Sequence, residues 1–215
     1  MDDTNKVKRF FSVRAGKFDS YYSKDKPGLW RFLDYLFRQS MYRRFVRTLE
    51  EASRLKNPSV LDIGCGAGRY SMALARTGAV SVLGIDFSHP MITRARRMAE
   101  NSGAEKNCEF VCGNFLEYQF MGMFDVTIAT GYFDYLKEPL PHLNKMRYLT
   151  LKKAIMTFPS RWHLRNIVRK IRLFFLGCPV YFYDRQQIEK LLRAANFKSF
   201  RIENLGRDYF VVAEV

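Results

Sequence analysis

Histidine is scarce in this chain, and cysteine is never paired in a metal-binding pattern. There are three histidines and four cysteines among 215 residues. The cysteines form no Cys-x-x-Cys pair and no cluster with histidine, which is the spacing that zinc sites need. We therefore expect no metal ion. We expect the four cysteines to be free, mostly buried thiols of a reducing compartment.

Long apolar runs are also missing. A membrane-spanning helix needs about 20 consecutive apolar residues, and the best candidate, residues 173–183, is interrupted by Gly177 and Pro179. The first residues, Met1-Asp2-Asp3, lack the basic and then apolar order of a signal peptide. These absences predict a cytoplasmic protein, with peripheral membrane contact as the remaining option.

Acidic residues are absent from one long segment. Between residues 139 and 183 there is no Asp or Glu but there are nine Lys and Arg, in a chain with a formal net charge of +15. Helical spacing within this segment separates an apolar face (Leu164, Ile167, Val168, Ile171, Phe174, Phe175) from a basic one (Arg161, Arg165, Arg169, Arg172). A basic amphipathic helix over 161–175 suits an anionic acceptor, an acidic membrane or RNA phosphates. The alternative is a lid helix with a merely solvated basic face.

The length and the hydrophobic content of 47% fit one globular domain. Residues 1–57 read as a helical cap, after which strands and helices alternate, as in parallel sheets with crossover helices. The expected strands are 59–63, 81–86, 109–113, 124–130 and 153–158, with helices at 68–77 and 88–101, the second capped by Ser88. Residues 58–158 then form a cofactor-binding core, and residues 159–184 form a basic lid insertion. The last segment, 185–215, holds a helix (185–195) and a two-strand hairpin (199–204, 209–213).

A glycine-rich loop follows the first expected strand and opens into a helix. Its glycines, Gly64, Gly66 and Gly68, let a ligand approach bare main chain at a helix N-terminus. The dinucleotide fingerprint needs a glycine where this chain has Arg69. Asp62, just before the loop, suits a cationic ligand and would repel a diphosphate. A nicotinamide-dependent oxidoreductase is therefore disfavoured.

The second expected strand ends in an acidic residue, Asp86, that is followed by an aromatic one. Asp86 is placed to accept the two hydroxyls of a ribose, and Phe87 offers an apolar neighbour for a base. A cationic amino-acid group, a ribose and an adenine together describe S-adenosyl-L-methionine (SAM), with S-adenosyl-L-homocysteine (SAH) as its product.

Four segments, 62–68, 84–88, 112–115 and 124–130, resemble the successive motifs of class I SAM-dependent methyltransferases. The resemblance implies an α/β, Rossmann-like, seven-stranded and mostly parallel sheet with a reversed last strand, here with an N-terminal helical cap and a basic helical insertion after strand five. It also implies the roles of individual residues: Gly64 and Gly66 approach the amino-acid moiety, Asp86 binds the ribose, Asn114 and Phe115 border the adenine, and Thr130 and Gly131 face the sulfonium. Asp62, Cys65, Gly68, Phe87 and Gly113 complete the expected cofactor set.

A second resemblance is to small-molecule O-methyltransferases of the magnesium-protoporphyrin and ubiquinone-biosynthesis type. It depends on Phe158-Pro159 followed by a basic helix, and on Arg44 upstream of the glycine loop. An arginine at that position can reach the methionine carboxylate. Alternatively, Arg44 is one of several solvated arginines without a role at the cofactor.

Methyl transfer is an in-line displacement, and a base is needed only when the acceptor must lose a proton. Candidate bases are Tyr132, Asp134 and Tyr135 after strand four, His163 after strand five, and Tyr21 or Tyr22 near the N-terminus; each is equally explained as a rim or surface residue. Residues 130–133 lack the Asp/Asn-Pro-Pro-Tyr/Phe motif of amino-methylating enzymes. We expect a small anionic or lipophilic acceptor methylated at oxygen. The alternatives are an RNA methyltransferase and a SAM-binding protein without activity, and the oligomeric state is left open.

Overall fold

The computed structural model describes residues 6–7, 10 and 28–215 of the chain. Tyr21 and Tyr22 lie outside the described residues. Within those residues, no helix has both the length and the apolar character needed to cross a bilayer.

Seven strands form one sheet in the order β3-β2-β1-β4-β5-β7-β6. Their bounds are β1 Ser59–Ile63, β2 Ser81–Asp86, β3 Cys108–Cys112, β4 Phe124–Ala129, β5 Thr150–Pro159, β6 Ser199–Asn204 and β7 Asp208–Glu214. The pairs from β3 to β5 are parallel, whereas β7 runs antiparallel to both β5 and β6. This is the Rossmann-like methyltransferase topology with a reversed last strand, so the expected fold class is confirmed.

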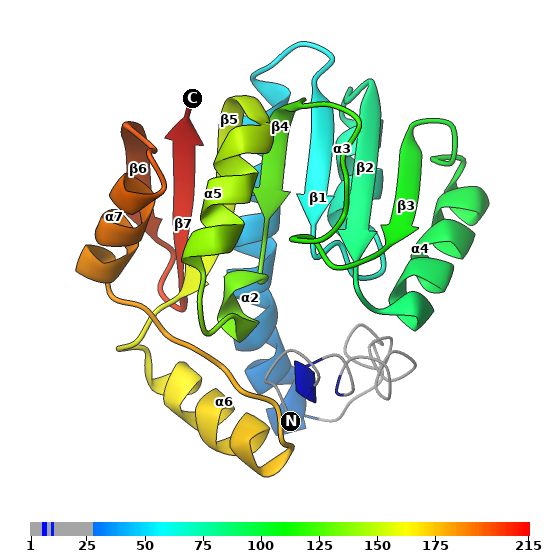
Figure 1. Ribbon diagram of the computed structural model, residues 1–215. Coiled ribbons are helices and arrows are strands. Elements are labelled where there is room, and N and C mark those ends of the chain that lie inside the picture. Colours follow the sequence, from blue (N-terminus) through cyan, green and yellow to red (C-terminus); the bar gives the residue numbers. More distant parts are fainter. Residues whose placement is uncertain (1–5, 8–9, 11–27) are drawn as a thin grey trace.

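Helices cover both faces of this sheet (Figure 1). Their bounds are α2 Gly28–Ser53, α3 Arg69–Arg76, α4 His89–Ser102, the short η2 Phe133–Tyr135, α5 Leu140–Leu149, α6 Leu164–Phe175 and α7 Arg185–Ala194. Residues of α2, α3 and α4 share one core cluster, and those of α5 and α7 share the other. Most of these elements lie within one or two residues of the bounds predicted from the sequence. No bounds were predicted for α5, and the predicted β5 begins three residues later than the observed strand.

Strand alternation explains the two clusters. In β1, Val60 belongs to the cluster under α3 and α4, while Leu61 and Ile63 belong to the cluster under α5 and α7. All three are at most 1% exposed. Strands that are apolar on both faces are typical of a parallel sheet buried between helices.

The carboxyl ends of β1, β2, β4 and β5 meet at one edge of the sheet, because these strands are parallel. The reversed β7 brings its beginning to the same edge, since Asp208 pairs with Pro159 at the end of β5. Helix α6 lies beyond this edge, at the bottom of Figure 1. In open α/β sheets, ligands bind at the carboxyl edge where the strand order reverses, here between β1 and β4.

Candidate active site

The glycine loop joins β1 to α3 at the carboxyl edge. The N–H groups of Gly64 and Cys65 both donate to the carbonyl of Ile85, at 2.8 and 3.1 Å, which anchors the loop to the end of β2. Gly66 has a φ of +54°, and a Cβ built on it would meet nothing within 4 Å. The backbone at Gly66 therefore faces open space, as a loop that receives a ligand must.

Asp86 connects the ends of β1 and β2. Its Oδ2 accepts a hydrogen bond from the Gly66 N–H at 3.0 Å, and its Oδ1 accepts one from the Ser88 N–H at 2.8 Å. A carboxylate offers about four lone-pair positions, so two are left for the hydroxyls of a ribose. Burial raises the pKa of Asp86. The expectation that Ser88 caps α4 is wrong for its side chain: the buried Ser88 hydroxyl makes no cap hydrogen bond.

Asp62 lies beneath the glycine loop, where it is 1% exposed. The Ser71 hydroxyl of α3 donates to its Oδ2 at 2.6 Å. Burial raises the pKa of Asp62 to about 7, and the nearby Asp86 carboxylate contributes to this rise. The carboxyl group thus ties the loop to the following helix. It does not stand in the open beside the loop, as its position in the sequence had led us to expect.

The raised pKa of Asp62 predicts a specific pH dependence of stability. The folded protein prefers the protonated Asp62 carboxyl more strongly than the unfolded chain does. The stabilisation that results is complete below the unfolded pKa near 3.8 and is lost as pH rises through about 7. We expect the free energy of unfolding to fall by about 2–3 kcal/mol between about pH 5 and pH 8, relative to Asp62→Asn. Denaturant titrations at several pH values measure it.

Asp125 provides the matched control for this titration. Hydrogen bonding to Lys152 lowers its pKa, so its titration falls below the same pH window. An Asp125→Asn variant should therefore retain the fall in stability between the two pH values. Identical pH profiles for wild type and Asp62→Asn would contradict the buried, protonated state of Asp62.

Tyr132, in the loop after β4, covers the first glycine of the cofactor loop. A Cβ built on Gly64 would lie 2.6 Å from the Tyr132 ring, so only glycine permits this contact. The Tyr132 hydroxyl lies 2.8 Å from Nδ1 of His142 on α5. Burial raises the pKa of Tyr132 and lowers the pKa of His142 to about 4. The pair is therefore neutral near pH 7, and Tyr132 is poorly suited to act as a base.

Five ionisable residues from distant parts of the chain meet at the same edge. They are Arg44 of α2, Asp134 of η2, Arg169 of α6, and Arg207 with Asp208 at the β6–β7 turn, and we call them the arginine cluster. Arg169 donates to Asp134 at 2.6 Å, and Arg44 lies 3.6 Å from Asp208. The two carboxylates are 3% and 2% exposed. Three guanidinium groups thus face two carboxylates in a site that water barely reaches.

Arg44 stands over the end of β4. A Cβ built on Gly131 would come within 3.2 Å of the Arg44 guanidinium, and the Gly131 N–H donates to Thr157 at 2.8 Å. Arg44 is thus brought beside Gly131, next to the cofactor loop, and is not a solvated surface residue. Its Nε is buried without a hydrogen-bond partner.

Asp134, one of the expected bases, occupies a structural position. Asp134 is the ion-pair partner of Arg169, although its Oδ1 is buried without a hydrogen-bond partner. His163 directly precedes α6, and its carbonyl accepts the N–H of Asn166 at 2.8 Å. Tyr135 accepts a hydrogen bond from Arg169 at 2.9 Å. Neither Asp134 nor Tyr135 is arranged as a free base.

Several of the expected cofactor residues turn their side chains elsewhere. The Phe115 ring is 4% exposed and packs in the core against Phe120, Tyr132 and His142. Asn114 donates to Glu117 at 2.7 Å and accepts from the Leu116 N–H, which closes the turn after β3. The Phe115 ring therefore does not face an adenine in this arrangement, and the Asn114 amide is partly engaged within the turn.

Five further positions of the expected set are also defined. Phe87 packs against the small cluster of Val7, Leu173 and Cys178. Gly113 donates its N–H to the carbonyl of Asp86 at 3.0 Å. Cys65 is buried, and burial raises the pKa of its thiol. Gly68 and Thr130 lie at the start of α3 and the end of β4, on the same edge.

Sequence reasoning missed Arg207, Asp208 and the pairing of Tyr132 with His142. No short motif marks them, and the two turn residues reach the site only because β7 is reversed. The available signal was the position of Asp208 at the beginning of the last strand, which was expected to be reversed.

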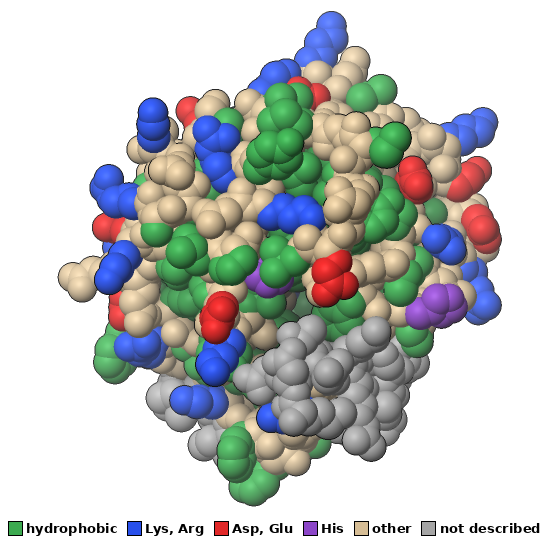
Figure 2. Space-filling view, viewed as in Figure 1, with side chains coloured by type: hydrophobic (Ala, Val, Ile, Leu, Met, Phe, Trp, Pro, Cys, Tyr) green, Lys and Arg blue, Asp and Glu red, His purple; other side chains and the backbone are tan. Residues whose placement is uncertain are grey.

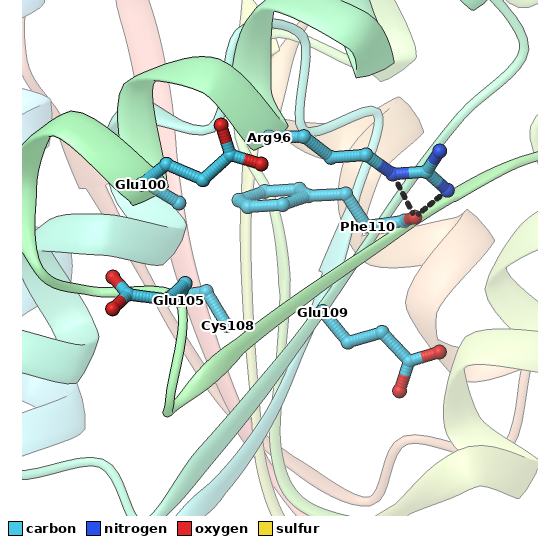
Figure 3. A pocket seen from close by; sticks show the side chains of 7 residues that line it. Arg96, Glu100, Glu105, Cys108, Glu109 and Phe110 are labelled. Atoms are coloured by element: carbon cyan, nitrogen blue, oxygen red, sulfur yellow. Dashed lines mark hydrogen bonds between the residues drawn. The ribbon is translucent and has the colours of Figure 1, made fainter.

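A separate hollow of about 210 Å³ lies between α4 and the beginning of β3. Figure 3 shows the Arg96 guanidinium bound to the carbonyl of Phe110, at 3.2 and 2.6 Å, with Glu100, Glu105 and Glu109 nearby. Ligand pockets usually measure about 300–1,000 Å³. The hollow includes none of the expected cofactor residues, so the carboxyl edge remains the candidate site.

The fold and the loop geometry define the class I SAM-dependent methyltransferases. Residues 54–195 match a family described as a methyltransferase domain, which is well over half of the chain. The protein belongs to this family. The sequence-based expectation of a methyltransferase is thereby confirmed.

Curated relatives differ in what their names say they act on. A tRNA U34 carboxymethyltransferase of Actinobacillus succinogenes is 26% identical over 104 residues, covering 48% of this chain and 32% of the relative. A 24-methylenesterol C-methyltransferase of Arabidopsis thaliana is 39% identical over 61 residues, covering 28% and 17%. The chain therefore spans a third or less of the length of these relatives.

Solved structures match over more of the chain. The magnesium protoporphyrin IX methyltransferase of Synechocystis PCC 6803, solved with bound SAH, has a TM-score of 0.79 and 20% identity and covers 99% of each chain. A possible histamine N-methyltransferase of Thermotoga maritima has a TM-score of 0.68 and 14% identity and covers 96% and 98%. At these identities the likeness establishes the fold alone.

Proposed function

We propose that the protein transfers the methyl group of SAM to a carboxylate oxygen of a small, lipophilic acceptor, leaving SAH. The observation that carries the acceptor class is Arg207, the guanidinium of the arginine cluster that forms no ion pair among the described residues, whereas Arg44 and Arg169 face Asp208 and Asp134. A partly buried excess of positive charge is a favourable place for an anion.

The residues of the loop fit SAM. The open space beside Gly66 receives the cofactor against main chain, and the unused lone pairs of Asp86 accept the ribose hydroxyls. Arg44, with its unpaired Nε, is assigned to the methionine carboxylate. When bound, SAM supplies an electrophilic methyl group on a sulfonium.

Arg207 is the best-placed residue for the acceptor carboxylate. Its Nε donates to Asn166 at 3.2 Å, and among the described residues it forms no ion pair. Burial lowers the pKa of Arg207, and the charge of Arg169 lowers it further. An acceptor carboxylate would relieve this repulsion. Arg169 is already engaged by Asp134, so it acts as a neighbour of the bound anion.

A carboxylate acceptor also fits the states of Tyr132 and Asp134, two of the candidate bases that the structure describes. Tyr132 keeps its proton, and Asp134 is held in an ion pair. A carboxylate has no proton to lose at neutral pH, so the remaining tasks are to exclude water and hold the oxygen in line with the methyl group. The buried site and the guanidinium groups supply both.

An RNA acceptor is the second candidate. The charge of +15 and the likeness to a protein named as a tRNA-modifying enzyme favour it. It requires exposed cations along a nucleic-acid track, whereas Arg44 and Arg169 have side chains only 15% and 11% exposed. A SAM-binding protein without activity is the third candidate, and it would show cofactor binding without turnover.

The test is methyl transfer from labelled SAM to a panel of lipophilic carboxylic acids and their primary amides, with cellular RNA as a separate fraction. We expect base-labile methyl esters from the acids and no product from the amides. Arg207→Gln should raise the KM for the acid at least tenfold while leaving SAM affinity unchanged. Methylated RNA without ester formation would refute the carboxylate proposal.

The control for Arg207 is Arg185→Gln. Arg185 is an exposed arginine on α7 that pairs with Glu189 at 2.9 Å, outside the arginine cluster. Its variant should have the KM of the wild type. An equal rise in KM for both variants would indicate a general loss of positive charge and would overturn the assignment of Arg207.

A further inference from the structure

Helix α6 contacts the rest of the domain through one of its faces. Its inward face carries Asn166, Arg169 and Leu173, of which Asn166 and Leu173 are 1% and 3% exposed. Asn166 donates to the carbonyls of Ser160 and Arg207 at 2.7 and 2.9 Å. Among its described side chains, α6 is thus held on the domain by the polar contacts of Asn166 and Arg169 and by the apolar cluster of Leu173 with Val7 and Cys178.

Three aromatic side chains of the same segment are exposed. Phe174 and Phe175 belong to the apolar face that the sequence predicts, and they are 78% and 80% exposed; Trp162, just before the helix, is 77% exposed. The two phenylalanine rings pack edge to face with centroids 5.9 Å apart. In Figure 2, hydrophobic side chains project at the lower margin, where Figure 1 has α6.

The aromatic pair is held in place by the end of the helix. The Cys178 N–H donates to the carbonyl of Leu173 at 2.9 Å, and the intervening Gly177 has a φ of +65°. Cys178 itself is 1% exposed. The exposed rings thus stand on an anchored turn.

Positive charge surrounds these rings. Arg161, Lys170 and Arg172 are exposed, and the sequence has no acidic residue between positions 139 and 183. Exposed aromatic rings flanked by Lys and Arg suit the interface of an anionic bilayer, where the rings reach the acyl boundary and the cations meet the headgroups. RNA phosphates would be attracted by the cations, but they would leave the projecting phenylalanine pair without a partner.

We propose that the outer face of α6, formed by Trp162, Phe174 and Phe175 with Lys170 and Arg172, docks on the surface of an anionic lipid bilayer. The rings insert among the headgroups, and the cations contact lipid phosphates. Each Lys or Arg near such a surface strengthens binding by about fivefold. This places the carboxyl edge of the sheet, and with it the arginine cluster, close to the membrane.

The test is flotation of the purified protein with vesicles of phosphatidylcholine, with and without phosphatidylglycerol. We expect binding to the anionic vesicles only, and a blue shift of fluorescence that Trp162→Phe abolishes. The double variant Phe174→Ser, Phe175→Ser should lose at least tenfold in affinity. Both rings are exposed, so this variant should have the melting temperature of the wild type.

The matched control is Met121→Ser with Met123→Ser. These side chains are 104% and 45% exposed in the loop before β4, away from α6, and their loss should leave vesicle binding unchanged. A second arm replaces Lys170 and Arg172 by Gln, which should weaken binding and reduce its dependence on salt. Equal vesicle binding by wild type and the double phenylalanine variant would overturn the proposal, as would RNA binding by a protein that ignores anionic vesicles.

Discussion

Replacing Asp86 by alanine should reduce the affinity for SAM and SAH by about 100-fold or more. Asp86 is the carboxylate to which we assign the two ribose hydroxyls, and each hydrogen bond to a charged group contributes about 1.5–3 kcal/mol. Its oxygens also hold the N–H groups of Gly66 and Ser88, so the variant loosens the loop that receives the cofactor. Calorimetric titration with both ligands measures the loss.

The two ligands distinguish this role from a purely electrostatic one. SAM and SAH share the ribose but differ in the sulfonium charge, so a ribose contact predicts nearly equal losses. A much larger loss for SAM would instead make Asp86 a partner of the positive charge. Asp86→Asn keeps the shape and one good acceptor, and it should lie between wild type and alanine.

A surface carboxylate on the neighbouring strand serves as the control for Asp86. Glu109 on β3 is exposed and lies outside the carboxyl edge, so Glu109→Ala should bind SAM like the wild type. Circular dichroism and thermal melting establish that each variant is folded. Wild-type SAM affinity in a folded Asp86→Ala protein would refute the assigned cofactor site.

The sequence was sufficient for the sheet because its signals are local. Each strand from β1 to β5 is a short apolar run, and the glycine spacing with Arg69 in place of a third fingerprint glycine pointed away from a dinucleotide. Asp86 and Gly66, predicted separately, are joined by a hydrogen bond of 3.0 Å. These features depend on nearest neighbours along the chain or on adjacent parallel strands.

The arginine cluster could not be foreseen in the same way. Arg44, Asp134, Arg169 and Asp208 are far apart in sequence, and only the antiparallel β7 and the folded-back α6 bring them together. The burial of individual side chains could not be predicted from the sequence either. Phe115 was expected at the adenine and lies in the core, and Asp62 was expected to face a ligand and lies under the loop. Residue type predicts chemistry, but side-chain direction depends on tertiary packing.

Replacing Arg169 by methionine should release α6 from the carboxyl edge. The Arg169 side chain, 11% exposed, donates to Asp134 at 2.6 Å and to Tyr135 at 2.9 Å. Its loss leaves the Asp134 carboxylate buried and unpaired, which destabilises by about 3–5 kcal/mol in comparable buried pairs. Among the side chains of α6 that the structure describes, only Asn166 and Leu173 are buried besides the half-buried Arg169, so we expect the helix to open locally while the sheet stays folded.

Hydrogen exchange with mass spectrometry measures this opening. Amides of 164–178 should exchange at least tenfold faster in Arg169→Met, with little change in the strands. Arg172→Met removes an exposed arginine one turn away, and it should alter stability by less than about 0.5 kcal/mol. Adding Asp134→Asn to Arg169→Met should restore part of the protection, because the unpaired charge is then gone.

The same variant tests whether α6 belongs to the acceptor side of the site. Arg169 lies next to Arg207 but not in the glycine loop, so its loss should leave SAM affinity near that of the wild type while turnover falls. If exchange in α6 were the same for Arg169→Met and Arg172→Met, the ion pair would not be what holds the helix. A helix anchored through Arg169 and exposed through Phe174 and Phe175 can connect a bilayer surface to the methyl-transfer site, because one element contacts both.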